Sequence, residues 1–128
     1  ALDAMVSYTT QRTQFGKPIA GHQLVQELIA DTSVDVEASR MLTWRVADLK
    51  TRGQSYTLAA SQAKLFASEA SVRAANNCVQ AHGGYGYVDS YPGGKLLRDA
   101  RVSTLYEGTS QIQKLLIGRA LTGISAFS

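Results

Sequence analysis

The residues best suited to chemistry lie towards the end of the chain, in the run Leu105-Tyr106-Glu107-Gly108-Thr109-Ser110-Gln111-Ile112-Gln113. A hydroxyl at Thr109 or Ser110 can cap a following helix, because it accepts from N–H groups that the first turn leaves unpaired. Gly108 lets the backbone turn tightly just before that helix. Glu107 is then a carboxylate one step outside an open helix start, which attracts anions. This order suggests a reactive site, although a capped helix with an acidic residue in its entry turn is the plainer alternative.

Two further polar turns contain glycine, namely Arg12-Thr13-Gln14-Phe15-Gly16 and Gln80-Ala81-His82-Gly83-Gly84-Tyr85-Gly86. If the helices run up and down, all three turns can meet at one end of a bundle, or face one another across a subunit contact. Together they supply a guanidinium, several amides, bare backbone N–H groups and one carboxylate. Such a set suits a ligand with a phosphate at one end and an acidic proton at the other.

Each of these residues also has a plain structural interpretation. Arg12 can be a solvent-facing cation at a helix end, where a positive charge is favourable, and Phe15 can be a packing residue. The glycine-rich turn follows a helix and not a strand, so it is no dinucleotide fingerprint. His22 and His82 are too far apart, and too poor in cysteine or carboxylate neighbours, to predict a metal site. No order of Ser, His and Asp suggests nucleophilic catalysis.

The elements that must position these turns are helices. Apolar residues recur at steps of three and four, and they predict helices over 1–12, 23–50, 56–81, 95–103 and 109–125. The inward stripe of the third helix is rich in alanine, which lets neighbouring helices approach closely. On its outer face, Glu69 and Arg73 are spaced to form an i,i+4 ion pair. The predicted fold is therefore all-α, an up-down four-helix bundle with four main helices.

Length and composition limit the classes of function. The 128 residues predict one domain over 1–128, and 45% hydrophobic against 18% charged residues is enough to bury a sizeable core. The net charge of +3 comes without a block of Lys and Arg, so we expect no nucleic-acid partner. The single cysteine, Cys78, is expected to be a buried small hydrophobe in a reducing compartment. No apolar run is long enough for a membrane span, and we expect a soluble, intracellular protein.

Taken together, the three turns resemble the C-terminal helical domain of the acyl-CoA dehydrogenases. The segment Arg12-Thr13-Gln14-Phe15-Gly16-Lys17-Pro18-Ile19, followed by His22-Gln23, is similar to the family's R-x-Q-F-G-K-P-I turn. The segment from Gln80 to Tyr87 is similar to its Q-x-x-G-G-x-G-[YF] motif. Arg98-Asp99-Ala100 with the run from Tyr106 to Gln113 is similar to its R-D-A … Y-E-G-T-S-x-I-Q signature. The resemblance covers nearly the whole chain, in the family's order and spacing.

The resemblance implies a flavoprotein that holds FAD, oxidises an acyl-CoA to the trans-2-enoyl-CoA and passes electrons to electron-transfer flavoprotein. It also implies a homo-oligomer, a dimer or a tetramer, located in the cytoplasm of a bacterium or in the mitochondrial matrix. Ala1 to Val6 already have a helical pattern without a preceding cap or an initiator Met, so we expect this chain to be part of a longer protein. The domain alone is then expected to fold, to be inactive and to bind FAD weakly or not at all.

By position, the resemblance implies FAD contacts at Arg12, Gln14, Phe15, Ile19, His22, Gln23, Gln80, Gly83, Gly84, Thr109 and Gln111. The first three would meet the adenosine and pyrophosphate of a neighbouring subunit's FAD. Tyr106, Glu107 and Gly108 would contact the substrate. No metal site is implied.

Glu107 would be the catalytic base and would take the proton from the carbon beside the thioester carbonyl. Burial would raise the pKa of this carboxyl and make it a stronger base. Its backbone N–H would donate to the thioester oxygen as negative charge develops there. An acyl-CoA oxidase, a flavin-dependent monooxygenase of the same fold and a non-catalytic helical oligomerisation module remain alternatives. The monooxygenase is disfavoured by Glu107 and the phosphate-type contacts.

Overall fold

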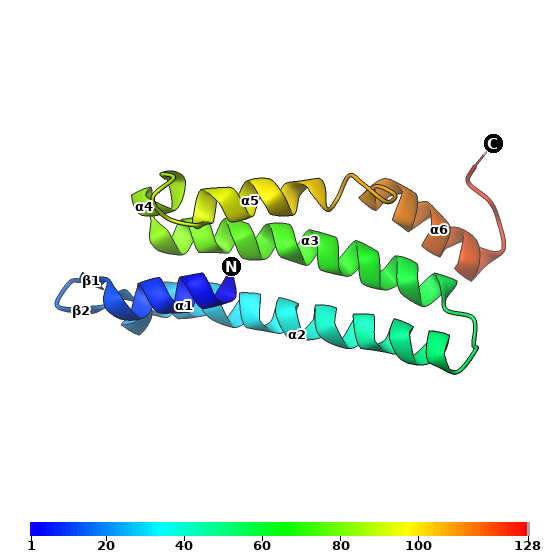
Figure 1. The fold of residues 1–128 in the computed structure, drawn as a ribbon, viewed down its shortest axis with the longest axis horizontal. Coiled ribbons are helices and arrows are strands. Elements are labelled where there is room, and N and C mark those ends of the chain that lie inside the picture. The colour runs from blue at the N-terminus through cyan, green and yellow to red at the C-terminus, as the bar shows by residue number, and fades with distance from the viewer. Residues whose placement is uncertain (128) are drawn as a thin grey trace.

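The computed structural model describes residues 1–127 (Figure 1). Most of this part of the chain is helical, with one two-stranded antiparallel ribbon and one short 3-10 helix. In chain order the elements are α1 (Leu2–Gln11), β1 (Thr13–Gln14), β2 (Lys17–Pro18), η1 (Ile19–Gly21), α2 (Gln23–Thr51), α3 (Thr57–His82), α4 (Gly84–Tyr87), α5 (Gly93–Val102) and α6 (Ser110–Thr122).

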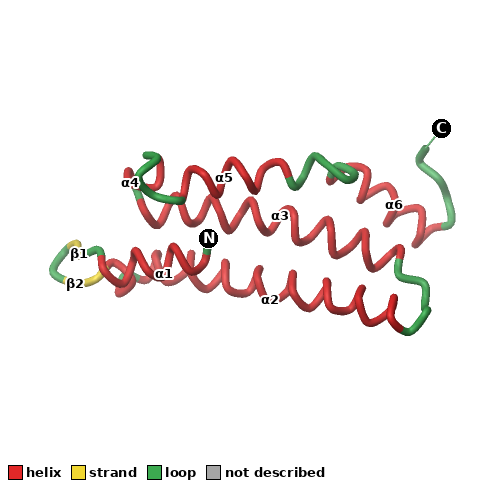
Figure 2. Tube along the Cα trace, viewed as in Figure 1, coloured by secondary structure: helices red, strands yellow, loops and turns green. Residues whose placement is uncertain are grey.

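The long helix α3 lies at the centre of the arrangement and contacts α1, α2, α4, α5 and α6. α2 runs antiparallel to it over its whole length. α5 and α6 follow one another along its other side, with their connecting loop above the middle of α3 (Figures 1 and 2). The ribbon β1–β2 and the short helix α4 lie at the end where α3 finishes. The result is an up-down bundle of four columns, in which α5 and α6 together make the fourth.

Small side chains allow so many neighbours around one helix. The buried residues of α3 are mostly alanine and serine, namely Ala59, Ser61, Ala63, Ser68, Ala70, Ala74, Ala75, Cys78, Ala81 and His82. A helix surface built from such residues lets other helices pack at the short end of the usual range of interaxial distances. Near the end that carries the ribbon, Met5, Cys78 and Ala81 form a buried cluster against which Leu2, Leu28 and Leu96 pack, among others.

The expected bundle and its five helices are confirmed, with boundaries that differ by at most three residues. The ribbon and α4 were not expected, since both are too short to show a periodic pattern. Cys78 is buried, as expected. The predicted pair of Glu69 and Arg73 is wrong: Arg73 instead makes a bidentate ion pair with Asp35 on α2, at 3.0 and 2.8 Å. These hydrogen bonds raise the pKa of the Arg73 guanidinium.

The expectation that all three polar turns meet at one end within a single chain is also wrong. The turns at 12–16 and 80–86 lie together at the end that carries the ribbon, whereas the turn at 106–111 lies beside the middle of α3 (Figure 1). The physical reason is α5, which runs back along α3 before α6 begins. Its ten residues move the start of α6 by about 15 Å at 1.5 Å per residue.

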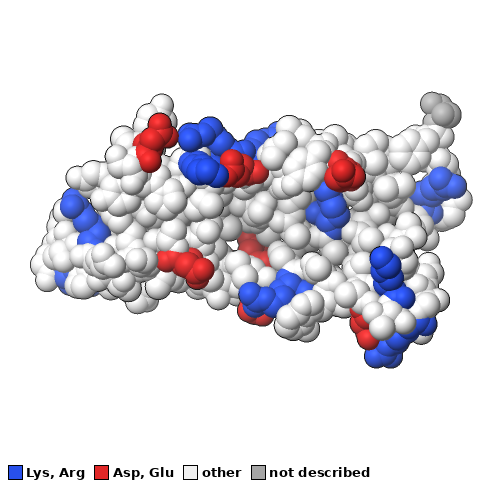
Figure 3. All heavy atoms as spheres, viewed as in Figure 1, with Lys and Arg blue, Asp and Glu red and all other residues white. Residues whose placement is uncertain are grey.

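On the face shown in Figure 3, Lys and Arg side chains are interspersed with Asp and Glu, and no continuous basic stripe crosses it. Within residues 1–127, no helix has both the length and the apolar character that a membrane crossing requires.

Gly86 is the glycine whose hydrogen is most tightly enclosed. A Cβ at this position would lie 2.4 Å from the carbonyl oxygen and 2.8 Å from the Cα of Val79 on α3, so α4 would have to move away. We expect Gly86→Ala to lower the free energy of unfolding by about 1–3 kcal/mol, the usual cost of overpacking, as measured by urea denaturation. Gly84→Ala is the control, because a Cβ there meets nothing within 4 Å. Equal stability of the two variants would contradict this packing.

Candidate functional site

A cavity of about 470 Å³ opens at the end of the bundle that carries the ribbon. It lies between the C-terminal end of α1, the ribbon and the α3–α4 junction. Six of the predicted cofactor contacts line it: Arg12, Gln14, Ile19, Gln80, Gly83 and Gly84. The structure therefore brings the first two polar turns together around one hollow, as the sequence analysis expected.

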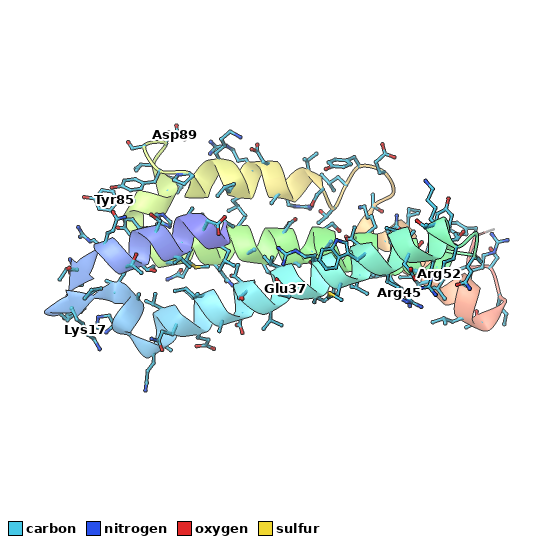
Figure 4. All side chains as sticks on the ribbon, turned by 60° about the horizontal axis from the view of Figure 1, so that its bottom comes forward. Lys17, Glu37, Arg45, Arg52, Tyr85 and Asp89 are labelled. Carbon is cyan, nitrogen blue, oxygen red and sulfur yellow. The ribbon has the colours of Figure 1, made fainter. Side chains whose placement is uncertain are left out.

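Arg12 is the cation of this cavity. It directly follows α1, and its guanidinium carbon lies 5.5 Å from the centroid of the Tyr85 ring, within cation–π range. Within residues 1–127, no carboxylate pairs with Arg12. Figure 4 shows Tyr85 at this end of the bundle, with Lys17 on the nearby ribbon and Arg45 and Arg52 at the opposite end. An uncompensated guanidinium beside glycine backbone is a suitable place for an anion such as a phosphate.

Aromatic rings also line the cavity, although no role for them was predicted from the sequence. Tyr8 stacks on His82 with 4.2 Å between ring centroids and 20° between planes. The Tyr91 ring lies 5.6 Å from that of Tyr8 and 5.9 Å from that of His82, between centroids. The Tyr85 ring lies 6.5 Å from Tyr8 and 5.1 Å from Tyr91. Tyr8 precedes Arg12 by four residues, and the Arg12 N–H donates to the Tyr8 carbonyl oxygen at 2.9 Å, so the two residues are one turn apart at the C-terminal end of α1. From this spacing, a place for Tyr8 beside Arg12 could have been predicted.

Burial shifts the pKa of two groups near the cavity, Tyr8 and Cys78. It raises the pKa of the Tyr8 hydroxyl, an effect that the nearby Arg12 cation partly opposes. Burial also raises the pKa of the Cys78 thiol, whose sulfur lies 3.7 Å from His82 Nδ1. His82 is 4% exposed, and its Nδ1 lies 2.7 Å from the carbonyl oxygen of Cys78. The cavity therefore rests on packed side chains, and Arg12 supplies a positive charge at its rim.

Three predicted contacts do not line the cavity: Phe15 in the ribbon, His22 after η1, and Gln23 at the start of α2. Gln14 pairs with Lys17, so Phe15 and Gly16 form a two-residue hairpin loop. Both have positive φ, +53° and +79°, which is the pattern of a type I′ turn. Phe15 is 93% exposed, and its ring meets the edge of His22 at 6.0 Å. Gln23, the first residue of α2, is exposed.

The remaining predicted residues lie at a second place, the loop between α5 and α6. Glu107 and Gly108 both have left-handed backbones, with φ of +54° and +86°. For a glutamate this conformation costs roughly 1–2 kcal/mol. The side chains of Tyr106 and Glu107 are exposed. The burial that the sequence analysis expected for Glu107 is not provided by residues 1–127.

Beyond this loop, Thr109 caps α6 as predicted, because its hydroxyl accepts from the Ile112 N–H at 3.3 Å. Gln111 lines a smaller cavity of about 190 Å³ between α3, α5 and α6, and does not face the first cavity. Lys64, which contacts the loop, is about 24 Å along α3 from Gln80 at 1.5 Å per residue. The predicted residues therefore form two separate sites on one chain.

The family model described as "Acyl-CoA dehydrogenase, C-terminal domain" matches residues 1–122. The chain belongs to the acyl-CoA dehydrogenase family. It is 49% identical over 123 residues to an acyl-CoA dehydrogenase of Bacillus subtilis, covering 96% of this chain and 32% of that protein. It is 43% identical over 117 residues to the mitochondrial short-chain specific acyl-CoA dehydrogenase of Bos taurus, and this match covers 91% of this chain and 28% of that protein. The chain thus spans about a third of the length of the curated relatives it matches, which include bacterial and mitochondrial proteins.

Two solved structures illustrate the range of the family. A glutaryl-CoA dehydrogenase of Mycobacterium smegmatis in complex with FADH2 is 30% identical, with a TM-score of 0.94 over 99% of this chain and 33% of that one. The prolyl acyl carrier protein oxidase AnaB is 34% identical, with a TM-score of 0.91 over 94% of this chain and 32% of that one. The same helical domain is therefore found in a dehydrogenase and in an oxidase.

Substitution of Phe15 tests the type I′ turn of the ribbon in this acyl-CoA dehydrogenase domain. An exposed phenylalanine with positive φ is unfavourable, whereas asparagine tolerates this conformation and is preferred in type I′ turns. We expect Phe15→Asn to raise the free energy of unfolding by about 1 kcal/mol, measured by urea denaturation. Phe15→Ala is the control, because it removes the ring and keeps the Cβ in the left-handed backbone. A Phe15→Asn variant no more stable than Phe15→Ala would contradict this account of the turn.

Proposed function

We propose that this chain is the C-terminal domain of an FAD-dependent acyl-CoA dehydrogenase that oxidises an acyl-CoA to the trans-2-enoyl-CoA, with Glu107 as the base. One observation carries the proposal. Glu107 projects from an anchored loop in a left-handed conformation, directly before a capped helix start. A carboxylate presented in this way is accessible to a substrate and fixed at its backbone, which is what proton abstraction requires.

In the proposed reaction, the Glu107 carboxylate accepts the proton from the carbon beside the thioester carbonyl. The hydrogen on the next carbon leaves with its electron pair, and the carbon–carbon double bond forms. FAD supplies the acceptor for that hydride. Within residues 1–127, the Glu107 N–H has no hydrogen-bond acceptor, so it is available to donate to the thioester oxygen. Such a donor stabilises the negative charge that develops there.

The first cavity suits the phosphate-bearing part of FAD. Arg12 provides charge without a carboxylate partner in the described chain, and Gln14 and Gln80 provide amide donors. Gly83 and Gly84 leave room for a bulky group, because a Cβ at either position would meet nothing within 4 Å. Phe15 is exposed and strained, which is understandable if its ring contacts a ligand or another subunit. His22 and Gln23 flank the cavity, and Thr109 and Gln111 would contact FAD from the second site.

The separation of the two sites favours an assembly in which the cavity of one chain and Glu107 of another serve the same active site. Exposed apolar side chains on two helices are consistent with a homo-oligomer: Leu24, Val34, Met41 and Trp44 on α2, and Leu121 on α6. In the complete protein, other domains or subunits would also bury Glu107. We infer for these reasons that the 128-residue chain alone is inactive and does not retain stoichiometric flavin. Electron-transfer flavoprotein is the proposed acceptor of electrons from the complete enzyme.

An acyl oxidase is the second candidate, because the similarity to AnaB places an oxidase within the same domain family. Both candidates use the same proton abstraction and differ in the acceptor that reoxidises the flavin. Turnover under air without an added electron acceptor would distinguish an oxidase from a dehydrogenase.

The base assignment predicts a large effect of Glu107→Gln in the full-length protein. The amide cannot accept the proton, so we expect kcat to fall by about 10²–10⁴-fold, the usual range for a general base. Flavin content, measured from its visible absorbance, should stay unchanged. Asp3→Asn, an exposed change of carboxylate to amide on α1, is the matched control and should leave kcat at the wild-type level. Survival of turnover in Glu107→Gln within about tenfold of wild type would show that the base lies elsewhere.

A further inference from the structure

The loop that carries Glu107 is attached to α3 by a lysine. The ammonium group of Lys64 donates to the carbonyl oxygen of Ser103 at 2.9 Å and to that of Gly108 at 2.8 Å. Ser103 directly follows α5, and Gly108 directly follows Glu107. One half-buried cation thus joins both ends of the loop to the central helix. The two bonds span 39 and 44 residues of sequence, so the attachment is wholly tertiary.

Further hydrogen bonds fix the same loop against α3 and α6. Ser71 lies two helical turns from Lys64 on the same face of α3. Its hydroxyl oxygen is 3.1 Å from the hydroxyl oxygen of Ser103. The Ser110 hydroxyl donates to the carboxylate of Glu69, also on α3. From α6, the Gln113 amide donates to the carbonyl oxygens of Glu107 at 3.3 Å and Gly108 at 3.4 Å. The backbone on both sides of Glu107 is therefore fixed, while its side chain is exposed.

Lys64 also matches the electrostatics of the loop. The carbonyl groups at the C-terminal end of a helix lack partners and carry partial negative charge, so a cation is favoured at the end of α5. The same ammonium group favours the left-handed turn at Glu107 and Gly108, because it bonds the Gly108 carbonyl oxygen in the orientation that this turn gives it.

We propose that Lys64 is a positioning residue for the catalytic base. It sets the backbone of Glu107 and Gly108, and through it the place of the Glu107 carboxylate, without touching the substrate. This role rests on the proposed function of Glu107. Since a misplacement of about 1 Å can lower a rate by about 10²-fold, loss of the two Lys64 hydrogen bonds should act on the chemical step and much less on substrate binding.

The test is Lys64→Met in the full-length flavoprotein, which removes the donor and keeps most of the apolar stem. We expect kcat per bound flavin to fall by about 10- to 100-fold, with KM for the acyl-CoA within about twofold of wild type and flavin content unchanged. Lys64→Arg keeps a cation with several N–H donors, and we expect it to recover part of the lost rate. Lys95→Met is the matched control, because Lys95 is exposed on the adjacent helix α5 and pairs with Asp99.

A second measurement does not depend on activity. Amide hydrogen exchange of residues 103–110 should be faster in Lys64→Met than in Lys95→Met, with α2 and α3 equally protected in both variants. If Lys64→Met does not fold, Lys64→Gln replaces it, since its shorter amide cannot reach both carbonyl groups.

Wild-type kcat in Lys64→Met beside an inactive Glu107→Gln would overturn the positioning role and leave the base assignment intact. So would a loss of flavin or stability with kcat per bound flavin unchanged, because that result would make Lys64 structural. An active Glu107→Gln would instead overturn the proposed function on which the inference rests.

Discussion

The close packing around α3 is the constraint on which both sites depend. Alanine and serine along its buried faces let α1, α2, α5 and α6 approach the same helix, so polar groups on α3 can reach short loops on its neighbours. Gln80 and His82, at its C-terminal end, line the cavity together with Tyr8 of α1 and with Arg12, which follows α1. Further back, Lys64 and Glu69 hold the loop that carries Glu107 and the start of α6. Larger side chains on α3 would separate these partners.

The residues with an unfavourable backbone conformation lie in the segments for which we propose a function. Two residues other than glycine have positive φ within the described chain, Phe15 and Glu107, and both belong to the motifs that resemble the family. Each costs free energy that the surrounding contacts must offset. Gln113 and Lys64 fix the turn at Glu107, whereas the side chain of Phe15 makes few contacts within its own chain. This difference agrees with a role for Glu107 on the surface of its own chain and for Phe15 against a ligand or a neighbouring subunit.

The helices and their order could be predicted from the sequence because long periodic patterns determine them. The two-residue strands and α4 could not, since neither is long enough to repeat a pattern. The meeting of Arg12 with Gln80, Gly83 and Gly84 was predictable from an up-down topology. The place of Glu107 was not, because α5 lies between α3 and α6 and shifts the last helix along the bundle. The bonds from Lys64 join residues about forty positions apart, and no local pattern in the chain indicates them.

We propose that the cavity of one chain and Glu107 of another complete the same active site. Co-expression of two full-length variants, Arg12→Glu and Glu107→Gln, tests it most directly, because each variant alone should be inactive. In a mixed dimer one of the two sites contains both intact residues, so we predict recovery of up to about a quarter of the wild-type activity for chains that pair at random. Absence of any recovered activity in the isolated mixed oligomer would contradict the account and would assign the cavity and the base of each site to a single chain.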